Sequence, residues 1–197
     1  TVAGLPLMAE TGLKYRLLKF IERLTYAAAN QVWPNSQSLL NFISEKKLCK
    51  PAKLSMIAKG STNGINCNRF SKSSLDEKIM ASVKDQVHFS EKDKYLLSIG
   101  RLVADKGITE LVHVFTQLQK DHVDLRLLLV GEFEETLDPL PAATLREIEI
   151  NPSIIHINWT NYVAYYLSLA HYFVFPSHLE GFPNVFLRAG ATVVPII

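Results

Sequence analysis

The sequence of 197 residues contains only two cysteines, Cys49 and Cys67, and neither stands in a CxxC pair or at metal-ligand spacing from a histidine. We therefore expect no zinc site and no other bound metal. Lone thiols of this kind are typical of reduced cysteines in the cytosol. No apolar run approaches the roughly 20 residues that span a bilayer, and the first residues lack the pattern of a signal peptide. These absences predict a cytoplasmic protein that does not cross a membrane.

The sequence also lacks a large excess of charge of one sign, since 21 Lys and Arg residues oppose 19 Asp and Glu residues and leave a formal net charge of +2. No dense basic tract is interleaved with aromatic residues, so we expect no nucleic-acid partner. No GxGxxG follows a predicted strand, which argues against a dinucleotide-dependent oxidoreductase. The Lys-Gly-Ser-Thr stretch at 59–62 has the wrong order for a phosphate-binding P-loop, which argues against a nucleoside triphosphatase.

Strand and helix patterns alternate through the second half of the chain. The predicted strands are 95–99, 125–130, 154–157 and 172–175, the predicted helices are 107–119, 142–149, 162–170 and 184–191, and an apolar run closes the chain at 193–197. Strands that alternate with helices of this length form a parallel sheet covered on both faces, with right-handed crossovers. The fold class that we expect is therefore α/β.

The 13–29 segment has the periodicity of an amphipathic helix. Its apolar stripe consists of Leu13, Leu17, Phe20, Ile21, Leu24 and Ala28. The basic side chains of Arg16, Lys19 and Arg23 fall on the opposite face. We favour a helix that packs the apolar stripe into a core and leaves its basic face in water. The alternative is a helix that lies on an anionic membrane surface.

Composition divides the chain into two domains. Predicted strands at 31–33 and 53–58, with a helix at 39–47 between them, form the tail of a first α/β domain. The 71–90 segment is polar and charged, which is typical of a connection between domains, and it carries one short predicted helix. The division that we expect is a partial N-terminal domain at 1–70, a linker at 71–90 and a C-terminal domain at 91–197.

Two loops follow predicted strands. The 100–107 loop carries Arg101 and Lys106, and the 175–185 loop carries Glu180 followed by Gly181. Because ligands of open α/β sheets bind outside the carboxyl ends of the strands, we expect these loops to face each other across that edge. The planar guanidinium of Arg101 and the point charge of Lys106 both suit a diphosphate. Taken alone, the first loop is more typical of an ordinary solvated turn, and it is the second loop that favours a binding site.

These two loops, together with the segments at 1–7, 60–65, 129–135 and 138–141, resemble the retaining, group-1 type glycosyltransferases with the GT-B fold. The resemblance is strongest to bacterial members that build capsule, lipopolysaccharide or lipid-linked glycans. It implies a GT-B-like chain whose Rossmann-type sheet forms most of the C-terminal, nucleotide-sugar-binding domain. It also implies a fragment that begins inside the N-terminal, acceptor-side domain and ends before the C-terminal domain is complete. No cofactor is implied besides the donor substrate, a UDP-sugar.

The resemblance also assigns roles to the loop residues. It implies that Arg101 and Lys106 bind the donor pyrophosphate and that Glu180 is the catalytic residue, a carboxylate that contacts the donor sugar. An alternative for Glu180 is an acid that caps its own helix. Further donor-binding positions implied by the resemblance are Gly100, Gly181, Phe182, Pro183, Asn184 and Arg188.

Arg188 departs from the family pattern, which places a second glutamate at this position to accept hydrogen bonds from the ribose hydroxyls. Arginine has no acceptor lone pairs and does not replace a carboxylate that faces a diol. The helix still points the position toward the expected crevice. The sequence therefore predicts a positive charge where the family has a negative one, and weak binding of ribose.

The function that these observations favour is a retaining glycosyltransferase fragment. It would transfer a hexose or N-acetylhexosamine from a UDP-type donor to a saccharide or lipid-linked acceptor, with a peripheral contact at the inner face of the cell membrane as an option. The alternative is a non-catalytic remnant that acts as a nucleotide-sugar-binding or interaction module. Open reading frames in the DNA that flanks the coding sequence distinguish the two, because stop codons on both sides favour the remnant.

Overall fold

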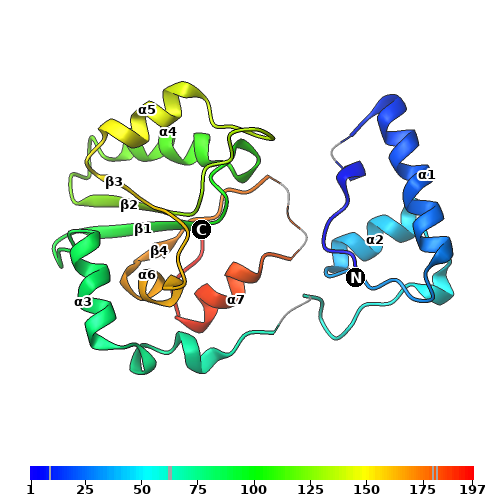
Figure 1. Ribbon diagram of the computed structural model, residues 1–197, viewed down its shortest axis with the longest axis horizontal. Coiled ribbons are helices and arrows are strands. Elements are labelled where there is room, and N and C mark those ends of the chain that lie inside the picture. Colours follow the sequence, from blue (N-terminus) through cyan, green and yellow to red (C-terminus); the bar gives the residue numbers. More distant parts are fainter. Residues whose placement is uncertain (9, 62–63, 179, 181) are drawn as a thin grey trace. The chain divides into compact units, whose positions relative to one another are not determined.

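The computed structural model of the protein describes residues 1–8, 10–61, 64–178, 180 and 182–197 (Figure 1). The chain divides into two compact units. The smaller unit comprises Thr1–Gly64 and Glu180–Asn184, and the larger unit comprises Ile65–Leu179 and Val185–Ile197. None of the helices in the described ranges combines the length and the apolar character that a membrane-spanning helix needs.

The larger unit is built on a parallel four-stranded sheet with the strand order β3-β2-β1-β4. Its strands are β1 (Lys94–Ile99), β2 (Leu125–Val130), β3 (Ile154–Ile157) and β4 (Tyr172–Phe173). Beyond β4 the closing apolar run adds one more parallel bridge, in which the Phe173 nitrogen donates to the Pro195 carbonyl at 2.8 Å and the Ile197 nitrogen donates to the Phe173 carbonyl at 2.9 Å. The parallel α/β sheet expected from the alternating pattern is confirmed.

Helices cover both faces of this sheet (Figure 1). On one face lie α4 (Ile108–Leu118) and α5 (Ala142–Ile150), and on the other lie α3 (Glu77–Gln86), α6 (Val163–Leu169) and α7 (Asn184–Ala191). The two cores follow from the alternation of side chains along β2, because Leu127 and Leu129 join the core under α4 and α5 while Leu128 and Val130 join the core of the opposite face. A strand buried on both sides in this way reads as a continuous apolar run.

The 71–90 segment, expected to be a linker, lies within the larger unit. Val83 of α3 and Val87, which follows it, are buried in the core of the sheet. The Tyr166 hydroxyl of α6 donates a hydrogen bond to Oε1 of Gln86 at 2.7 Å. Ile79 and Met80 of α3 pack against the same core beside the two valines, so the helix belongs to the sheet although the segment is polar in composition.

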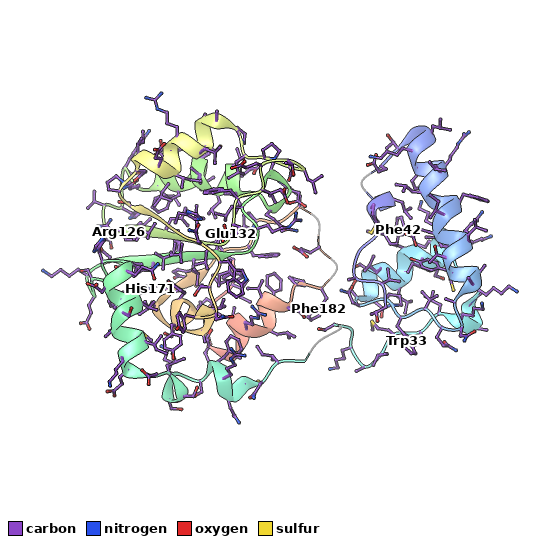
Figure 2. All side chains as sticks on the ribbon, viewed as in Figure 1. Trp33, Phe42, Arg126, Glu132, His171 and Phe182 are labelled. Carbon is purple, nitrogen blue, oxygen red and sulfur yellow. The ribbon has the colours of Figure 1, made fainter. Side chains whose placement is uncertain are left out.

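The smaller unit has its own core, formed by Leu5, Leu7, Tyr26, Val32, Leu39, Ile43 and Leu48. Two helices, α1 (Gly12–Ala28) and α2 (Gln37–Glu45), pack around it, and Phe42 of α2 lies against this core (Figure 2). The strands expected at 31–33 and 53–58 are reduced to a single parallel bridge between Val32 and Leu54. A short 3-10 turn at Pro51–Lys53 precedes the second of these segments and overlaps it only at Lys53.

The favoured interpretation of α1 was wrong. The apolar stripe is exposed, with 82% of Leu13, 60% of Phe20 and 55% of Leu24 accessible to solvent. The helix instead packs its other face, on which Tyr26 is buried and Leu18 is partly buried. Both faces of α1 carry apolar side chains, so periodicity alone did not show which of them is covered.

Candidate functional site

A cavity of about 440 Å³ opens at the carboxyl ends of the parallel strands in the larger unit. It is lined by the ends of β1 and β2, by the loop after β3, by the start of α6, by two residues of the turn Cys67–Phe70 and by one residue of α7. The lining residues are Arg69, Phe70, Ile99, Gly100, Arg101, Val130, Gly131, Glu132, Trp159, Thr160, Asn161, Val163, Ala164 and Arg188. The position and size are those of a small-ligand site in an open α/β sheet.

Two glycines allow the strand ends to approach each other closely. Gly131 has a φ of +150°, and a Cβ at this position would lie 1.8 Å from the carbonyl oxygen of Gly100. The Gly100 nitrogen donates to the Val130 carbonyl at 3.0 Å, and the Gly131 nitrogen donates to the Ile157 carbonyl at 2.8 Å. Any side chain at position 131 would therefore push β1 and β2 apart at the edge where the cavity begins.

Positive charge dominates the wall of the cavity. Arg69, Arg101 and Arg188 contribute three guanidinium groups, whereas Glu132 contributes the single carboxylate among the lining residues. All three arginines are exposed at the mouth. Within the part of the chain that the structure describes, their guanidinium groups form neither an ion pair nor a hydrogen bond. Such groups are available to bind an anion.

Glu132 has a positioning role. Its Oε1 accepts a hydrogen bond from the backbone nitrogen of Trp159 at 2.9 Å, and its own carbonyl accepts one from the Leu102 nitrogen at 2.8 Å. The residue thus connects the ends of three strands, because Leu102 follows β1 and Trp159 follows β3. One carboxylate oxygen is already engaged, which leaves the cavity with few side-chain acceptors.

The rest of the wall is apolar. Phe70, Ile99 and Val130 line it together with Val163 and Ala164. Phe70 also belongs to the core under the sheet, so this wall is held in place by packing. An apolar surface beside a group of arginines suits a ligand that has both a flat ring and an anionic group.

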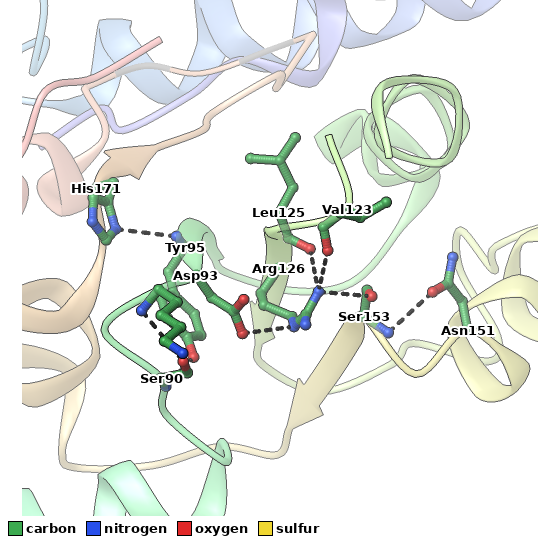
Figure 3. A network of polar contacts seen from close by, with 10 residues as sticks. Ser90, Asp93, Tyr95, Val123, Leu125, Arg126, Asn151, Ser153 and His171 are labelled. Carbon is green, nitrogen blue, oxygen red and sulfur yellow. Dashed lines mark hydrogen bonds and ion pairs between the residues drawn. The ribbon is translucent and has the colours of Figure 1, made fainter. Parts of the chain in front are cut away.

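An arginine at the other end of the sheet provides a contrast. Figure 2 shows Arg126 and Glu132 at opposite ends of β2. In Figure 3, Arg126 forms an ion pair with Asp93 at 3.1 Å and donates to the Ser153 hydroxyl at 3.2 Å. It also donates to the Val123 carbonyl at 3.0 Å and to the Leu125 carbonyl at 2.9 Å. This arginine has a structural role, since its guanidinium is held by an ion pair and three hydrogen bonds within the larger unit, unlike those of the cavity arginines.

Among the residues expected in the site, the structure brings Gly100, Arg101 and Arg188 to the cavity. Lys106 lies outside it. The Lys106 ammonium is 3.3 Å from the Ser177 hydroxyl and 3.8 Å from the Asp105 carboxylate. These contacts join the first loop to the 175–178 segment.

The two expected loops approach each other closely in this region. The His178 nitrogen donates to the Asp105 carbonyl at 3.0 Å. A Cβ on Gly107, whose φ is +67°, would lie 2.3 Å from the Pro176 carbonyl oxygen. The close approach therefore requires glycine at position 107.

The remaining expected residues belong to the second loop. Glu180, Phe182, Pro183 and Asn184 are grouped with the smaller unit, and Gly181 lies outside the described residues. Glu180 is exposed, and within the smaller unit the Asn184 side-chain oxygen accepts a hydrogen bond from the Ser61 hydroxyl at 3.1 Å. The donor-binding and catalytic roles of these residues stay predictions.

Sequence reasoning missed several cavity residues. Glu132 and Trp159 follow β2 and β3, so the rule that parallel strands end at one edge could have found them. No comparable signal exists for Arg69, because it comes from the short 3-10 turn Cys67–Phe70, which precedes every strand of the larger unit.

Comparison with known proteins gives a consistent result. Residues 80–197 match the family described as glycosyl transferases group 1. The chain is 31% identical over 198 residues to the capsular polysaccharide biosynthesis glycosyltransferase CapM of Staphylococcus aureus, and the alignment covers 100% of this chain and 50% of CapM. It is 25% identical over 179 residues to the N-acetylgalactosamine-N,N'-diacetylbacillosaminyl-diphospho-undecaprenol 4-alpha-N-acetylgalactosaminyltransferase of Campylobacter jejuni, covering 91% of this chain and 44% of that enzyme. The chain spans about half the length of these curated relatives.

Solved structures show the same fold. The glycosyltransferase WaaG, involved in lipopolysaccharide biosynthesis, matches with a TM-score of 0.72 and 16% identity over 94% of this chain and 49% of WaaG. HepE of Anabaena, in complex with UDP and glucose, matches with a TM-score of 0.74 and 14% identity over 92% of this chain and 47% of HepE. The larger unit and the smaller unit together therefore have the fold of part of a GT-B glycosyltransferase.

Proposed function

Because the chain belongs to the group 1 glycosyl transferases, we propose that it carries the donor-binding part of a retaining glycosyltransferase that uses a UDP-sugar. The enzyme would add a hexose or N-acetylhexosamine to a saccharide or lipid-linked acceptor in the synthesis of a cell-surface polysaccharide. Among the proteins that resemble this chain, CapM is named for capsular polysaccharide biosynthesis, and the Campylobacter jejuni enzyme is named as an N-acetylgalactosaminyltransferase that acts on a diphospho-undecaprenol-linked saccharide. The observation that carries the proposal is the cavity at the carboxyl edge, where an apolar wall meets three arginines that the described residues leave without a partner.

The cavity residues have distinct tasks in this proposal. The apolar wall beside Phe70 and Val163 holds the flat base, and Trp159 lies at the mouth. Arg101 directs its donors at the diphosphate. When the glycosidic bond breaks, negative charge develops on the leaving diphosphate, and a guanidinium already in place stabilises that charge without rearrangement. We assign Lys106 as the second cation for the diphosphate, outside the cavity, and Glu180 as the carboxylate that contacts the donor sugar.

Binding of UDP to the wild-type chain tests this proposal. Each charged hydrogen bond contributes roughly 1.5–3 kcal/mol, so Arg101→Ala should weaken UDP binding about tenfold to a hundredfold. Calorimetry measures the affinity directly. Arg146→Ala is the matched control, because Arg146 is exposed on α5 and does not line the cavity. Equal UDP affinities for wild type and Arg101→Ala would mean that the first loop is only a surface turn.

The exposed stripe on α1 supports a further part of the proposal, a peripheral membrane contact. Leu13, Phe20 and Leu24 present apolar surface to solvent, and Arg16 is exposed on the same helix. A helix that exposes both apolar and basic side chains binds the interface of an anionic bilayer. Such a contact would keep the enzyme beside a lipid-linked acceptor.

Flotation with vesicles of phosphatidylcholine and phosphatidylglycerol measures this contact. We expect the wild-type chain to float with anionic vesicles and the double variant Phe20→Ser, Leu24→Ser to stay in solution. Leu137→Ser is the control, because Leu137 is 83% exposed and belongs to the larger unit, whereas α1 belongs to the smaller unit. Wild-type chain that stays in solution with these vesicles would refute the membrane contact and leave the donor site untouched.

A further inference from the structure

The proposed function assigns Arg101 to the 5′ phosphates of a nucleotide, and two further arginines also line the cavity. Arg69 comes from the 3-10 turn Cys67–Phe70 and Arg188 from α7, so two separate elements bring a guanidinium to the same 440 Å³ cavity. Neither side chain has an ion pair or hydrogen bond among the described residues. In contrast, Arg126 at the opposite end of the sheet is bound by Asp93, Ser153 and two carbonyls.

Side-chain acceptors for a ribose diol are few in the cavity, since among the lining residues only Glu132, Thr160 and Asn161 carry side-chain oxygens. A vicinal diol donates two hydrogen bonds and binds best to acceptors, yet guanidinium groups only donate. The single carboxylate among the lining residues, Glu132, already accepts from the Trp159 nitrogen. Donor-rich walls fit oxygen atoms that carry negative charge, and arginine forms paired hydrogen bonds with phosphate in particular.

We propose that Arg69 and Arg188 form a second anion subsite in the cavity, which binds a phosphoryl group separate from the 5′ phosphates of the nucleotide. The proposal rests on the proposed function, since it takes the cavity as the nucleoside site and Arg101 as the arginine for the 5′ phosphates. The phosphoryl group is either attached to the ribose or a free phosphate ion. In both cases its charge compensates two arginines that a plain ribose leaves without acceptors.

Calorimetry with uridine nucleotides distinguishes the two sources. In phosphate-free buffer at constant ionic strength, the affinity for uridine 3′,5′-bisphosphate is compared with that for uridine 5′-monophosphate. A second arm measures uridine 5′-monophosphate with and without added inorganic phosphate. One additional charged group should raise the affinity about tenfold to a hundredfold in one of the two arms. A gain in the first arm means a phosphorylated ribose, and a gain in the second means a free ion.

Two variants test whether the gain arises at this subsite. Arg69→Gln and Arg188→Gln should each reduce the gain to about threefold or less, because each removes one guanidinium from the subsite. Arg146→Gln, with the same change of charge outside the cavity, should keep the gain in full. Circular dichroism confirms that each variant is folded. No gain in either arm for the wild-type chain, or a gain that survives in both cavity variants, overturns the proposal.

The same titrations separate this inference from the proposed function. Failure of the proposed function would show as absence of UDP binding to the wild-type chain, whatever the bisphosphate does. Failure of the inference would show as UDP binding with Arg101-dependent affinity and no response to a second phosphoryl group.

Discussion

Arg188→Glu reverses the charge at the position where α7 meets the cavity, and it should tighten the binding of UDP through the ribose. The new carboxylate supplies two acceptor oxygens to the 2′ and 3′ hydroxyls, whereas the arginine supplies none. In the wild type, water partly replaces these two charged hydrogen bonds to the ribose. Forming them in the variant should therefore strengthen binding by about 2–4 kcal/mol. That free energy corresponds to a gain in affinity of roughly thirtyfold to a thousandfold.

Repulsion between the new carboxylate and the diphosphate opposes this gain. Two unit charges about 8 Å apart in water interact by roughly 0.5 kcal/mol, and physiological salt screens much of that. Arg188 is exposed, so the high dielectric constant of water applies. The repulsion acts on the phosphates alone and the gain acts on the hydroxyls alone, which allows an experiment to separate them.

The assay is calorimetry with UDP and with its 2′,3′-dideoxy analogue, for the wild type and Arg188→Glu. The variant should bind UDP more tightly than the wild type does, and most of the gain should be absent for the analogue. Arg188→Gln, which offers a single neutral acceptor, should fall between the two. Equal changes for both ligands, or no gain for UDP in a folded sample, would show that position 188 does not contact the ribose and that the role implied by the resemblance is wrong.

Further predictions concern the scaffold of the site, and urea unfolding measures each of them. Gly131→Ala should lower the free energy of unfolding by about 2 kcal/mol or more, because the new Cβ would lie 1.8 Å from the Gly100 carbonyl oxygen. The control Gly190→Ala should be neutral or stabilising, because a Cβ at position 190 meets no atom within 4 Å. Unchanged stability of Gly131→Ala would contradict the close approach of the strand ends. Arg126→Met should cost about 2 kcal/mol through loss of the Asp93 ion pair and the carbonyl contacts, whereas the exposed Arg146→Met should cost almost nothing. Equal stabilities of these two variants would refute the structural role of Arg126.

The sheet was predictable from sequence because its strands are buried on both faces. The 125–130 run is continuously apolar except for Arg126. Its odd-numbered leucines pack into the core on one face of the sheet, and Leu128 packs into the core on the other face. The parallel topology predicts the carboxyl edge of the sheet as the place of a ligand site, and Arg101 and Arg188 line the cavity at that edge, while their donor-binding roles stay predictions. The strand expected at 172–175 is shorter in the structure, since its pairing with β1 covers only Tyr172 and Phe173.

The errors have physical causes as well. Both faces of α1 carry apolar side chains, and tertiary packing decides which of them is covered. Helical periodicity shows that the faces exist but does not show which one is packed. Arg69 was missed because it reaches the cavity from a short 3-10 turn distant in sequence from every strand end. The role of Lys106 at the diphosphate stays a prediction, and the turn Ala104–Lys106 with the left-handed Gly107 brings this part of the loop close to Pro176 and Ser177.

A crystal structure of the chain with UDP tests the central claim most directly, the claim that the cavity at the carboxyl edge of the sheet is the nucleotide site. We expect the uracil ring to lie against the apolar wall near Phe70 and Val163. We expect phosphate oxygens within hydrogen-bond distance of the Arg101 guanidinium. UDP bound elsewhere on the larger unit, or an empty cavity at saturating UDP, would contradict it.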